Sequence, residues 1–354
     1  MKAIGYVQSL PPTDPDSLFD FELATPTPGP RDLLVAVHAV SVNPIDTKVR
    51  MRAQGTPEQP KILGFDCAGV VQFTGPDATF FKPGDEVFYA GSILRPGTNS
   101  ELHVVDERLV GPKPRSLSFA QAAALPLTSV TAWELLFDRL RLASAAGGPS
   151  VGPSAPLGRE EKTPQSSASL LVIGASGGVG SILVQLARQL TGLTVLASAS
   201  RPETQQWVLQ NGAHHAIDHS KKLSQEVRAL GIHFVEYIIG LTHTDQHFAE
   251  IVELIAPQGR FALIDDPAPL DINKLKPKSV SLHWESMFTR SSFQTPDMIE
   301  QHRILQQIST LVDEGRIRTT LNKVAGRIDA ANLRAAHAAI ESHTSIGKIV
   351  LEGF

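Results

Sequence analysis

Three small residues stand at the spacing of a nucleotide-binding turn: Ala175, Gly177 and Gly180 fit G-x-G-x-x-G, with alanine in the first position. The apolar run from Leu170 to Ile173 before them is typical of a strand buried on both faces. Apolar residues then recur at helical spacing from Ile182 onward. Such a turn lets a pyrophosphate approach the backbone, and the N–H groups at the helix start bind the anion. The predicted dinucleotide site comprises Ala175, Ser176, Gly177, Gly178, Val179 and Gly180.

Two alternatives exist for the same letters. Residues 174–178 also fit G-x-S-x-G, the nucleophile elbow of serine hydrolases, with Ser176 as nucleophile and Asp265 and His283 following in hydrolase order. A glycine turn can also serve packing alone. Neither alternative explains the whole strand, turn and helix together with Gly180, so we favour the nucleotide site.

The residues at 197–201, at the end of the next strand-like run, indicate which dinucleotide binds. NAD enzymes place an acidic residue there to bind the ribose hydroxyls. This chain instead has Ala197-Ser198-Ala199-Ser200-Arg201, and the Ser200 hydroxyl and Arg201 guanidinium suit a 2′-phosphate. The segment therefore predicts NADPH as cofactor. The alternative is that Arg201 is solvated and Ser200 caps a helix that begins near Pro202.

The alternation of strands and helices predicts an α/β fold in two domains. Residues 1–127 show short strand patterns broken by Pro and Gly, which is typical of a β-rich domain. From residue 128 to 290, strand-like runs alternate with helical stretches, which indicates a doubly wound parallel sheet. The intervening 143–168 stretch is rich in Gly, Pro, Ser and Ala, so we expect a flexible loop there without chemistry.

Composition excludes several function classes. The chain has 354 residues, 42% of them hydrophobic and 19% charged, with a net charge of −4. This balance gives no reason to expect nucleic acid or an anionic membrane as a partner. No apolar run is long enough to span a bilayer, and the first residues lack a signal-peptide core, so we expect a cytoplasmic protein.

Cys67 is the only cysteine. An intrachain disulfide and a zinc site built from several thiolates are therefore impossible. Its small, apolar neighbours from Ala68 to Val71 predict a buried side chain rather than a reactive thiol.

Several motifs together resemble one family. They are Val42–Asp46, Leu63–Val71, Lys82–Val87, the turn at 175–180 and Gly347–Leu351. In this order and spacing the chain resembles the medium-chain dehydrogenase/reductase superfamily, and within it the zinc-independent quinone oxidoreductases related to zeta-crystallin. Ser200–Thr204 and Arg95–Thr98 are similar to proteins labelled zinc-type alcohol dehydrogenase-like. The resemblance implies a GroES-like β-rich domain, completed by residues 291–354, and a Rossmann domain over 128–290.

The resemblance also permits a test for zinc. Zinc-dependent relatives bind the catalytic ion with a Cys, the His of a Gly-His-Glu motif and a later Cys or His. Here those first two positions are Asn43 and Phe65. An amide is a poor zinc ligand and a phenyl ring is none, so we predict neither catalytic nor structural zinc. Zinc-type alcohol dehydrogenation remains the alternative activity.

The 12 histidines raise a separate metal question. His243 and His247 are four residues apart, and His214, His215 and His219 cluster. Neither pattern contains the glutamate of H-E-x-x-H, so we expect solvated histidines and no metal site.

Reduction is the natural direction without a metal Lewis acid. Hydride delivered from NADPH to a quinone or an α,β-unsaturated carbonyl compound puts charge on a remote oxygen, which hydrogen-bond donors stabilise. The resemblance places the site between the domains, with Asn43 and Asp46 on its floor. The further cofactor contacts that it implies are Thr128, Thr131, Gly240, Leu241, Leu263 and Lys348.

Lys48 departs from the family pattern, because several quinone reductases have tyrosine at that position. A lysine there could donate a proton or stabilise an enolate. The alternatives are that Lys48 and Arg50 form a solvated basic rim and that Asp46 only holds the loop after Pro44.

The resemblance implies a homodimer joined through an edge strand of the cofactor sheet. The stretch SVSLHW, residues 279–284, is the segment expected there. A protein that binds NADPH without catalysis is a further alternative, and the sequence does not identify the substrate.

Overall fold

The computed structural model describes residues 1–143 and 168–354. The chain divides into two compact units: unit 1 contains residues 1–130 and 287–354, and unit 2 contains residues 131–286. These divisions lie three and four residues from the expected boundaries at 127/128 and 290/291. Apart from its two end residues, the loop expected at 143–168 lies outside the described residues.

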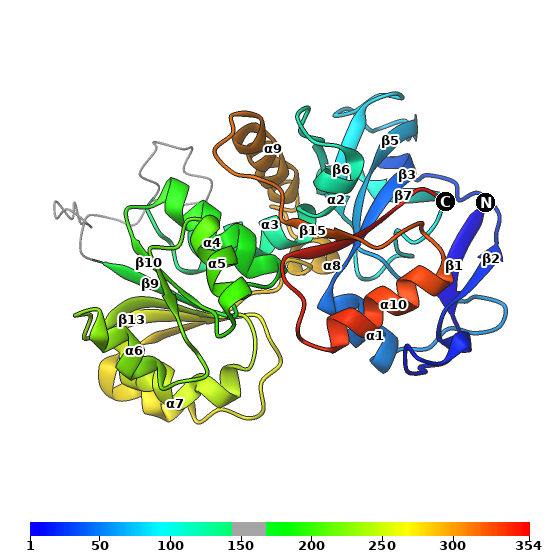
Figure 1. Cartoon of the computed structure of the whole chain (residues 1–354). Helices are drawn as coiled ribbons and strands as arrows, with labels where there is room; N and C mark the ends of the chain where they lie inside the picture. Colours follow the sequence, from blue (N-terminus) through cyan, green and yellow to red (C-terminus); the bar gives the residue numbers. More distant parts are fainter. Residues whose placement is uncertain (144–167) are drawn as a thin grey trace. The chain divides into compact units, whose positions relative to one another are not determined.

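Unit 2 is built on a six-stranded sheet in which every neighbouring pair is parallel. Its order is β11 (His215–Ile217), β10 (Thr194–Ser198), β9 (Ser169–Ile173), β12 (Val235–Gly240), β13 (Ile255–Leu263) and β14 (Ser281–Trp284). Helices α4 (Gly178–Leu190) and α5 (Pro202–Gln210) cover one face, and α6 (Leu223–Ala229) and α7 (Thr244–Leu254) cover the other (Figure 1). The first strand thus lies inside the sheet, as in a Rossmann fold.

The core of unit 2 lies between the sheet and its helices. Every residue of β9 is buried, as its continuous apolar run predicts. Leu171 and Ile238 of the sheet join Phe248 and Ile251 of α7 in one apolar cluster. Burial of each such side chain contributes about 1.5–3 kcal/mol. The packing therefore holds the strands of this sheet, and with them their carboxyl ends, in fixed positions.

Unit 1 contains two sheets, and only one of their strand pairs is parallel. The larger has the order β15 (Leu321–Val324), β16 (Lys348–Glu352), β3 (Asp32–Val42), β5 (Asp66–Thr74), β6 (Glu86–Ala90) and β8 (Val110–Pro112), with β7 (Leu102–Asp106) also on β3. The smaller has the order β2 (Phe19–Glu22), β1 (Lys2–Tyr6) and β4 (Lys61–Ile62). Only β15 and β16 run parallel. This is the expected GroES-like arrangement.

The remaining elements are helical and short. The α-helices are α1 (Pro44–Arg52), α2 (Phe119–Ala123), α3 (Pro126–Trp133), α8 (Thr289–Phe293), α9 (Glu300–Asp313) and α10 (Ala330–Glu341). A π-helical segment (Glu134–Arg139) follows α3, and 3-10 turns lie at Pro15–Ser17, Glu107–Leu109 and Ile272–Lys278. None of the helices in the described residues has both the length and the apolar character to cross a membrane.

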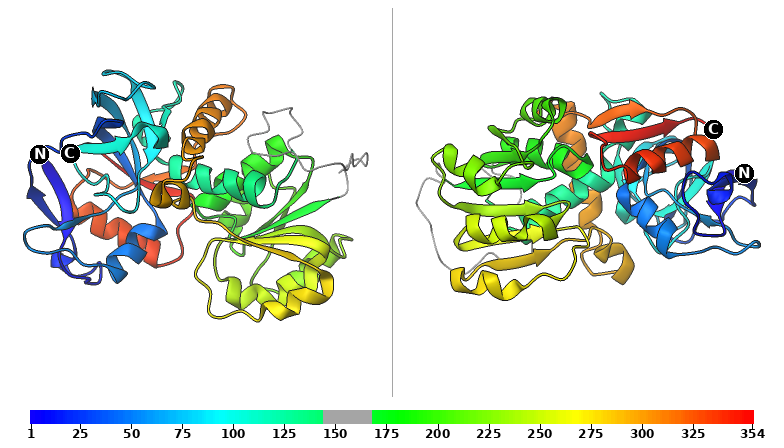
Figure 2. Two further views of the ribbon diagram at one scale, coloured as in Figure 1. Left: turned by 180° about the vertical axis from the view of Figure 1, so that it is seen from behind. Right: turned by 60° about the horizontal axis from the view of Figure 1, so that its bottom comes forward.

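The C-terminal strand completes unit 1. In β16, Ile349 pairs with Val42 of β3 in antiparallel register. The two termini consequently lie near each other within this unit, as Figures 1 and 2 show from three directions. On the adjoining strand β5, Cys67 is fully buried, as its small neighbours predict.

Candidate functional site

The glycine turn joins β9 to α4. Gly174 has a φ of +82°, which favours glycine. A Cβ added to Gly180 would lie 2.5 Å from the Ala175 Cα, so only glycine allows α4 this close to the turn. At Gly177, the N-cap of α4, an added Cβ would meet nothing nearer than the Gly174 carbonyl at 3.7 Å, and no side chain caps the helix. The first-turn N–H groups therefore have room for an anion.

Other predicted cofactor residues lie at the same edge of the sheet. The Leu241 N–H donates to the Ile173 carbonyl at 3.1 Å, and the Ile264 N–H donates to the Gly240 carbonyl at 3.2 Å. These bonds tie the carboxyl ends of β9, β12 and β13 together. The structure thus brings Gly240, Leu241 and Leu263 to the edge that carries the glycine turn.

The segment after β10 carries the polar residues expected at a 2′-phosphate. The Ser198 hydroxyl accepts a hydrogen bond from the Gly174 N–H at 3.0 Å. Arg201, not Ser200, is the N-cap of α5, and its N–H donates to the Thr204 hydroxyl at 3.1 Å. The alternative in which Ser200 caps this helix is therefore wrong.

The Arg201 side chain is partly exposed. Its Nε lies 3.1 Å from a Glu203 carboxylate oxygen, and the two side chains are 41% and 57% exposed. Exposed ion pairs of this kind contribute little, so this contact does not fix the guanidinium strongly.

The structure does not assemble a hydrolase site. Asp265 accepts hydrogen bonds from the Thr244 N–H at 2.9 Å and the Thr244 hydroxyl at 2.7 Å. His283 pairs with Ala262 within the sheet, on a strand separated from β9 by two others. Neighbouring strands are about 4.8 Å apart, so His283 is too distant to activate Ser176. The nucleophile-elbow interpretation is therefore wrong.

A buried polar cluster lies in unit 1 around Asn43. The Asn43 Nδ2 group donates to Asp66 Oδ2 at 2.8 Å. The Lys348 ammonium lies 3.2 Å from the same Asp66 oxygen, donates to the Val42 carbonyl at 3.0 Å and also donates to Asn43 Oδ1. The Leu127 N–H, at the start of α3, donates to Asp66 Oδ1 at 2.7 Å. Asn43, Asp66 and Lys348 are all buried, so this network is shielded from water.

Asp46 borders the cluster and caps α1. Its carboxylate accepts hydrogen bonds from the Asn43 N–H at 2.7 Å and the Gly64 N–H at 3.0 Å. Pro44 occupies the first turn of the helix, where its missing N–H costs nothing. The loop expected after Pro44 is thus a helix, and Asp46 stabilises its N-terminus.

Burial dominates the electrostatics of this cluster. Desolvation raises the pKa of Asp46 to about 7, while the N–H groups of Asn43 and Gly64 and the Lys348 charge act in the opposite direction. Burial also raises the pKa of Asp66 and lowers that of Lys348, and their mutual attraction opposes both shifts.

Lys48 and Arg50 have different environments. Lys48 is partly exposed, and it projects from another side of α1 than Asp46 because the two are only two residues apart. Arg50 is 1% exposed, and its guanidinium contacts His337 Nδ1 at 3.0 Å and Glu341 Oε1 at 2.5 Å. The expected basic rim is therefore wrong for Arg50, since α10 covers it.

Thr128 and Thr131 are both buried on α3. The Thr128 hydroxyl donates to the Leu125 carbonyl at 3.0 Å. The division between the units falls between these residues, with Thr128 in unit 1 and Thr131 in unit 2. The structure thus brings most predicted site residues into two groups, one at the edge of the parallel sheet and one around Asn43, while Lys48, Thr128 and Thr131 are assigned to neither group.

Sequence reasoning missed Asp66 as a site residue. It follows Phe65 at the start of β5, and an acidic residue at the start of a buried strand was the available signal. Phe65 is itself buried and packs edge-on against Phe288, with ring centroids 5.2 Å apart.

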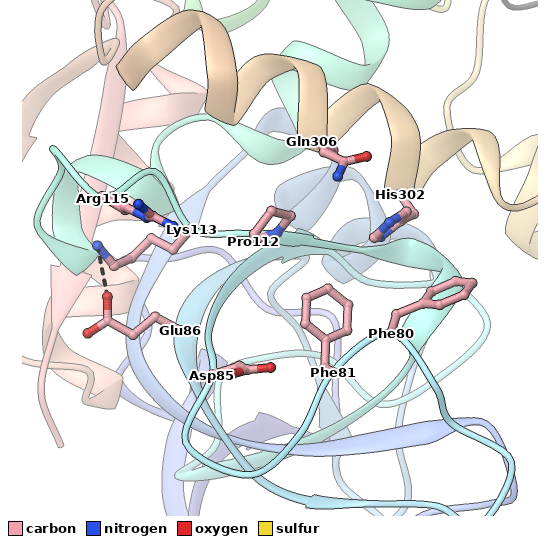
Figure 3. Close-up of a pocket in the computed structure, with 9 residues that line it drawn as sticks. All are labelled: Phe80, Phe81, Asp85, Glu86, Pro112, Lys113, Arg115, His302 and Gln306. Atoms are coloured by element: carbon pink, nitrogen blue, oxygen red, sulfur yellow. Dashed lines mark ion pairs between the residues drawn. The ribbon is translucent and has the colours of Figure 1, made fainter. Parts of the chain in front are cut away.

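A cavity of about 530 Å³ lies elsewhere in unit 1 (Figure 3). It is lined by Phe80, Phe81, Asp85, Glu86, Pro112, Lys113, Arg115, His302 and Gln306. None of these is a predicted site residue. The Lys113 ammonium is already 3.1 Å from a Glu86 oxygen and donates to two backbone carbonyls, so part of the lining charge is internally paired.

A Rossmann unit with a glycine turn, joined to a GroES-like unit, defines a class of two-domain oxidoreductases. Residues 29–116 match the alcohol dehydrogenase GroES-like domain, and residues 211–351 match the zinc-binding dehydrogenase family. The chain belongs to the medium-chain dehydrogenase/reductase superfamily, which confirms the resemblance.

Relatives within this superfamily carry two kinds of name. The chain is 38% identical over 352 residues to a zinc-type alcohol dehydrogenase-like protein of Staphylococcus epidermidis, covering 99% of each. It is 31% identical over 258 residues to human quinone oxidoreductase, covering 71% of this chain and 70% of that protein. A solved structure described as a putative zinc-dependent alcohol dehydrogenase from Rhizobium etli is 56% identical, with a TM-score of 0.92 and coverage of 100% and 98%.

A quinone oxidoreductase of Escherichia coli, solved in complex with NADPH, shares the fold. Its TM-score is 0.78 at 22% identity, over 99% of this chain and all of that one.

The residues around Asn43 do not fit the zinc ion that some of these names mention. Both amide atoms of Asn43 bind other side chains, and Phe65 has no donor atom. The Lys348 ammonium beside them would repel a divalent cation. Within residues 1–143 and 168–354, no three His, Cys, Asp or Glu side chains gather in a way that could hold a metal.

Proposed function

We propose that the protein is an NADPH-dependent reductase that transfers hydride to a quinone or an α,β-unsaturated carbonyl compound, without catalytic zinc. The observation that carries this proposal is the side-chain set at Asn43 and Phe65, where a buried lysine accompanies an amide and a phenyl ring. Alkoxide formation from a simple alcohol has no Lewis acid in such a site, whereas enone reduction needs none.

The cofactor assignment is supported by the edge of the parallel sheet. Bound NADPH would supply the hydride. The N–H groups of the first turn of α4 would hold its pyrophosphate, and Ser200 and Arg201 would bind the 2′-phosphate. No carboxylate in the segment from Ala197 to Arg201 opposes that phosphate. The NADPH bound by the E. coli enzyme agrees with this assignment.

The residues around Asn43 divide into two roles in this proposal. Asn43 and Asp46 already use their polar atoms within the protein, so we assign them to positioning the floor of the substrate site. Lys48 is partly exposed but projects from another side of α1 than Asp46, so it acts as the proton donor to the reduced substrate only if the substrate extends past that floor. Human quinone oxidoreductase, at 31% identity, supports the substrate class by its name.

The test combines cofactor binding with metal analysis of one sample. We expect fluorescence titration to show that NADPH binds at least about tenfold more tightly than NADH, with no stoichiometric zinc. Arg201→Gln should weaken NADPH binding roughly 10- to 100-fold and leave NADH binding unchanged, because charge-assisted hydrogen bonds contribute about 1.5–3 kcal/mol. Arg228→Gln, in an exposed ion pair on α6, is the matched control.

Three outcomes would overturn the proposal. One zinc ion per chain, or equal affinity for both cofactors, would restore alcohol dehydrogenation as the leading activity. If NADPH binds but no quinone or enone promotes its oxidation, the protein binds NADPH without this catalysis.

A further inference from the structure

Three histidines from two segments of the chain lie near the residue before the glycine turn. His219 follows β11, His243 precedes α7, and His247 lies on α7. The rings of His219 and His247 meet edge-on with centroids 6.1 Å apart. His219 and His247 are partly exposed, and His243 is exposed.

A hydrogen-bond chain connects His219 to the turn. The Gly174 N–H donates to the Ser198 hydroxyl at 3.0 Å, and that hydroxyl lies 3.2 Å from His219 Nδ1. Neutral His219 can accept the serine proton at Nδ1, whereas a protonated ring would donate to the serine oxygen. The loop before α7 also touches the turn, because a Cβ added to Gly174 would lie 2.7 Å from the Thr242 methyl group. His219 is thus connected through Ser198 to Gly174, the residue that directly precedes the predicted turn at 175–180.

The charges around these rings come from every adjoining segment. Asp218 on its own segment raises the pKa of His219, while His243 and Arg201 lower it, and burial lowers it most. Burial, His219 and His243 lower the pKa of His247, against smaller opposite effects from Glu250 and Asp245 of α7. The nearby cation Arg201 thus disfavours a proton on His219 until an anion arrives.

We propose that His219, with His243 and His247, forms part of the subsite for the cofactor 2′-phosphate, and that bound phosphate draws a proton from solvent onto this histidine cluster. The inference rests on the proposed NADPH specificity. A dianion beside a neutral imidazole favours the imidazolium form, and by linkage a proton on the cluster strengthens phosphate binding. The affinity for NADPH, unlike that for NADH, should therefore rise as pH falls.

Calorimetry of the unmodified protein tests this inference directly. Titrations with NADPH and NADH at pH 6.5, in two buffers of different ionisation enthalpy, measure the protons exchanged on binding. We expect net proton uptake with NADPH and almost none with NADH. The 2′-phosphate itself has a pKa of about 6 and would release a proton on binding to a cationic site. This release opposes the expected uptake by the histidines.

Variants locate the proton. His219→Asn keeps an acceptor for Ser198 but cannot titrate, so it should reduce proton uptake. It should also flatten the expected rise in NADPH affinity between pH 8 and pH 6, which for a one-unit pKa change is at most about tenfold. The variant that also carries His243→Gln and His247→Gln should abolish the uptake. Exposed His233→Asn in the same unit is the matched control.

Three results separate the two proposals. Equal proton uptake with both cofactors would overturn the histidine inference, as would uptake that persists in the triple variant. Absence of NADPH binding in the unmodified protein would instead overturn the proposed function.

Discussion

Lys348 is buried inside unit 1, where its side-chain nitrogen contacts Asp66, Asn43 and the Val42 carbonyl. Asp66 and Lys348 are 0% and 3% exposed, so the charge of each is compensated mainly by the other. Removal of one partner from such a pair costs far more than the pair itself contributes. This residue links the C-terminal strand β16 to the predicted site residues.

Lys348→Met should therefore destabilise the protein strongly. We expect a loss of about 3–5 kcal/mol in the free energy of unfolding, because Asp66 keeps a buried, uncompensated charge. The double variant with Asp66→Asn should recover much of that loss, which urea unfolding of both variants would measure. Lys323→Met, on the exposed side of β15, is the control. Equal losses in the single and double variants would contradict this interpretation.

Single residues differed in how far the sequence predicted them. The small residues from Ala175 to Gly180 were predictable because strand, turn and helix are contiguous, and their spacing alone specifies the geometry. Asp66 and Arg50 were not, because their partners lie at Lys348 and Glu341, almost 300 residues away. From the sequence alone, a charged side chain is predicted to be exposed unless its distant partner is known.

At the scale of elements, α1 and α10 are joined through a buried histidine. The Arg50 guanidinium donates to His337 Nδ1, and burial followed by the Arg50 charge lowers the pKa of His337 to about 3. On the sheet of unit 1, burial similarly lowers the pKa of His103 to about 4. Both rings remain neutral in the folded state while the unfolded chain takes up protons below about pH 6.5.

Acid should therefore weaken the fold through these histidines. Their contribution to stability is fully present above about pH 6.5 and is lost as pH falls toward 4, at about 1.4 kcal/mol per pH unit for each ring. Asp46 acts in the opposite direction, because its raised pKa makes the folded state bind the extra proton below about pH 7. The difference in the pH dependence of the free energy of unfolding between His337→Gln and the unmodified protein gives the contribution of His337 alone.

Urea unfolding at pH 7.5, 6.0 and 5.0 provides that comparison. The His337→Gln variant should lose less free energy of unfolding between pH 6.0 and 5.0 than the unmodified protein, by about 1.4 kcal/mol. Parallel pH dependences for the two proteins would show that His337 titrates in the folded state.

The elements themselves were largely predictable because hydrophobic periodicity is local. The strands β9 and β14 lie at the segments that the sequence indicated, Leu170–Ile173 and residues 279–284. The helix after Pro44 was missed because α1 has only 9 residues and little apolar patterning, so its capping residues resemble those of a loop.

At the scale of the whole molecule, β14 ends the parallel sheet. It pairs with β13 alone in the sheet order of the described residues, and its Trp284 side chain is 58% exposed. An edge strand with an exposed aromatic residue is suited to pairing with a second copy across a two-fold axis. We therefore expect a homodimer that joins two sheets at β14.

Light scattering after size-exclusion chromatography would test this expectation. The unmodified protein should elute at twice the chain mass of 38.1 kDa. Ser281→Lys combined with Trp284→Lys should give the monomer, because two lysines at a paired edge repel across the two-fold axis. Leu209→Lys, an exposed position on α5, should remain dimeric. A dimer that survives the β14 changes would place the interface elsewhere.

The division into two domains was predicted from composition and periodicity. The identity of the substrate was not predicted. The side chains that select a substrate come from several segments, and a sequence does not show which of them converge.

The burial of Cys67 matters for the substrates proposed here. Quinones and α,β-unsaturated carbonyl compounds are electrophiles that alkylate accessible thiolates. The chain has one thiol, which is fully buried in β5, and burial raises its pKa to about 12. An enzyme with this arrangement offers its own substrates no thiolate to modify. Its resistance to self-inactivation would then be a property of the GroES-like sheet itself.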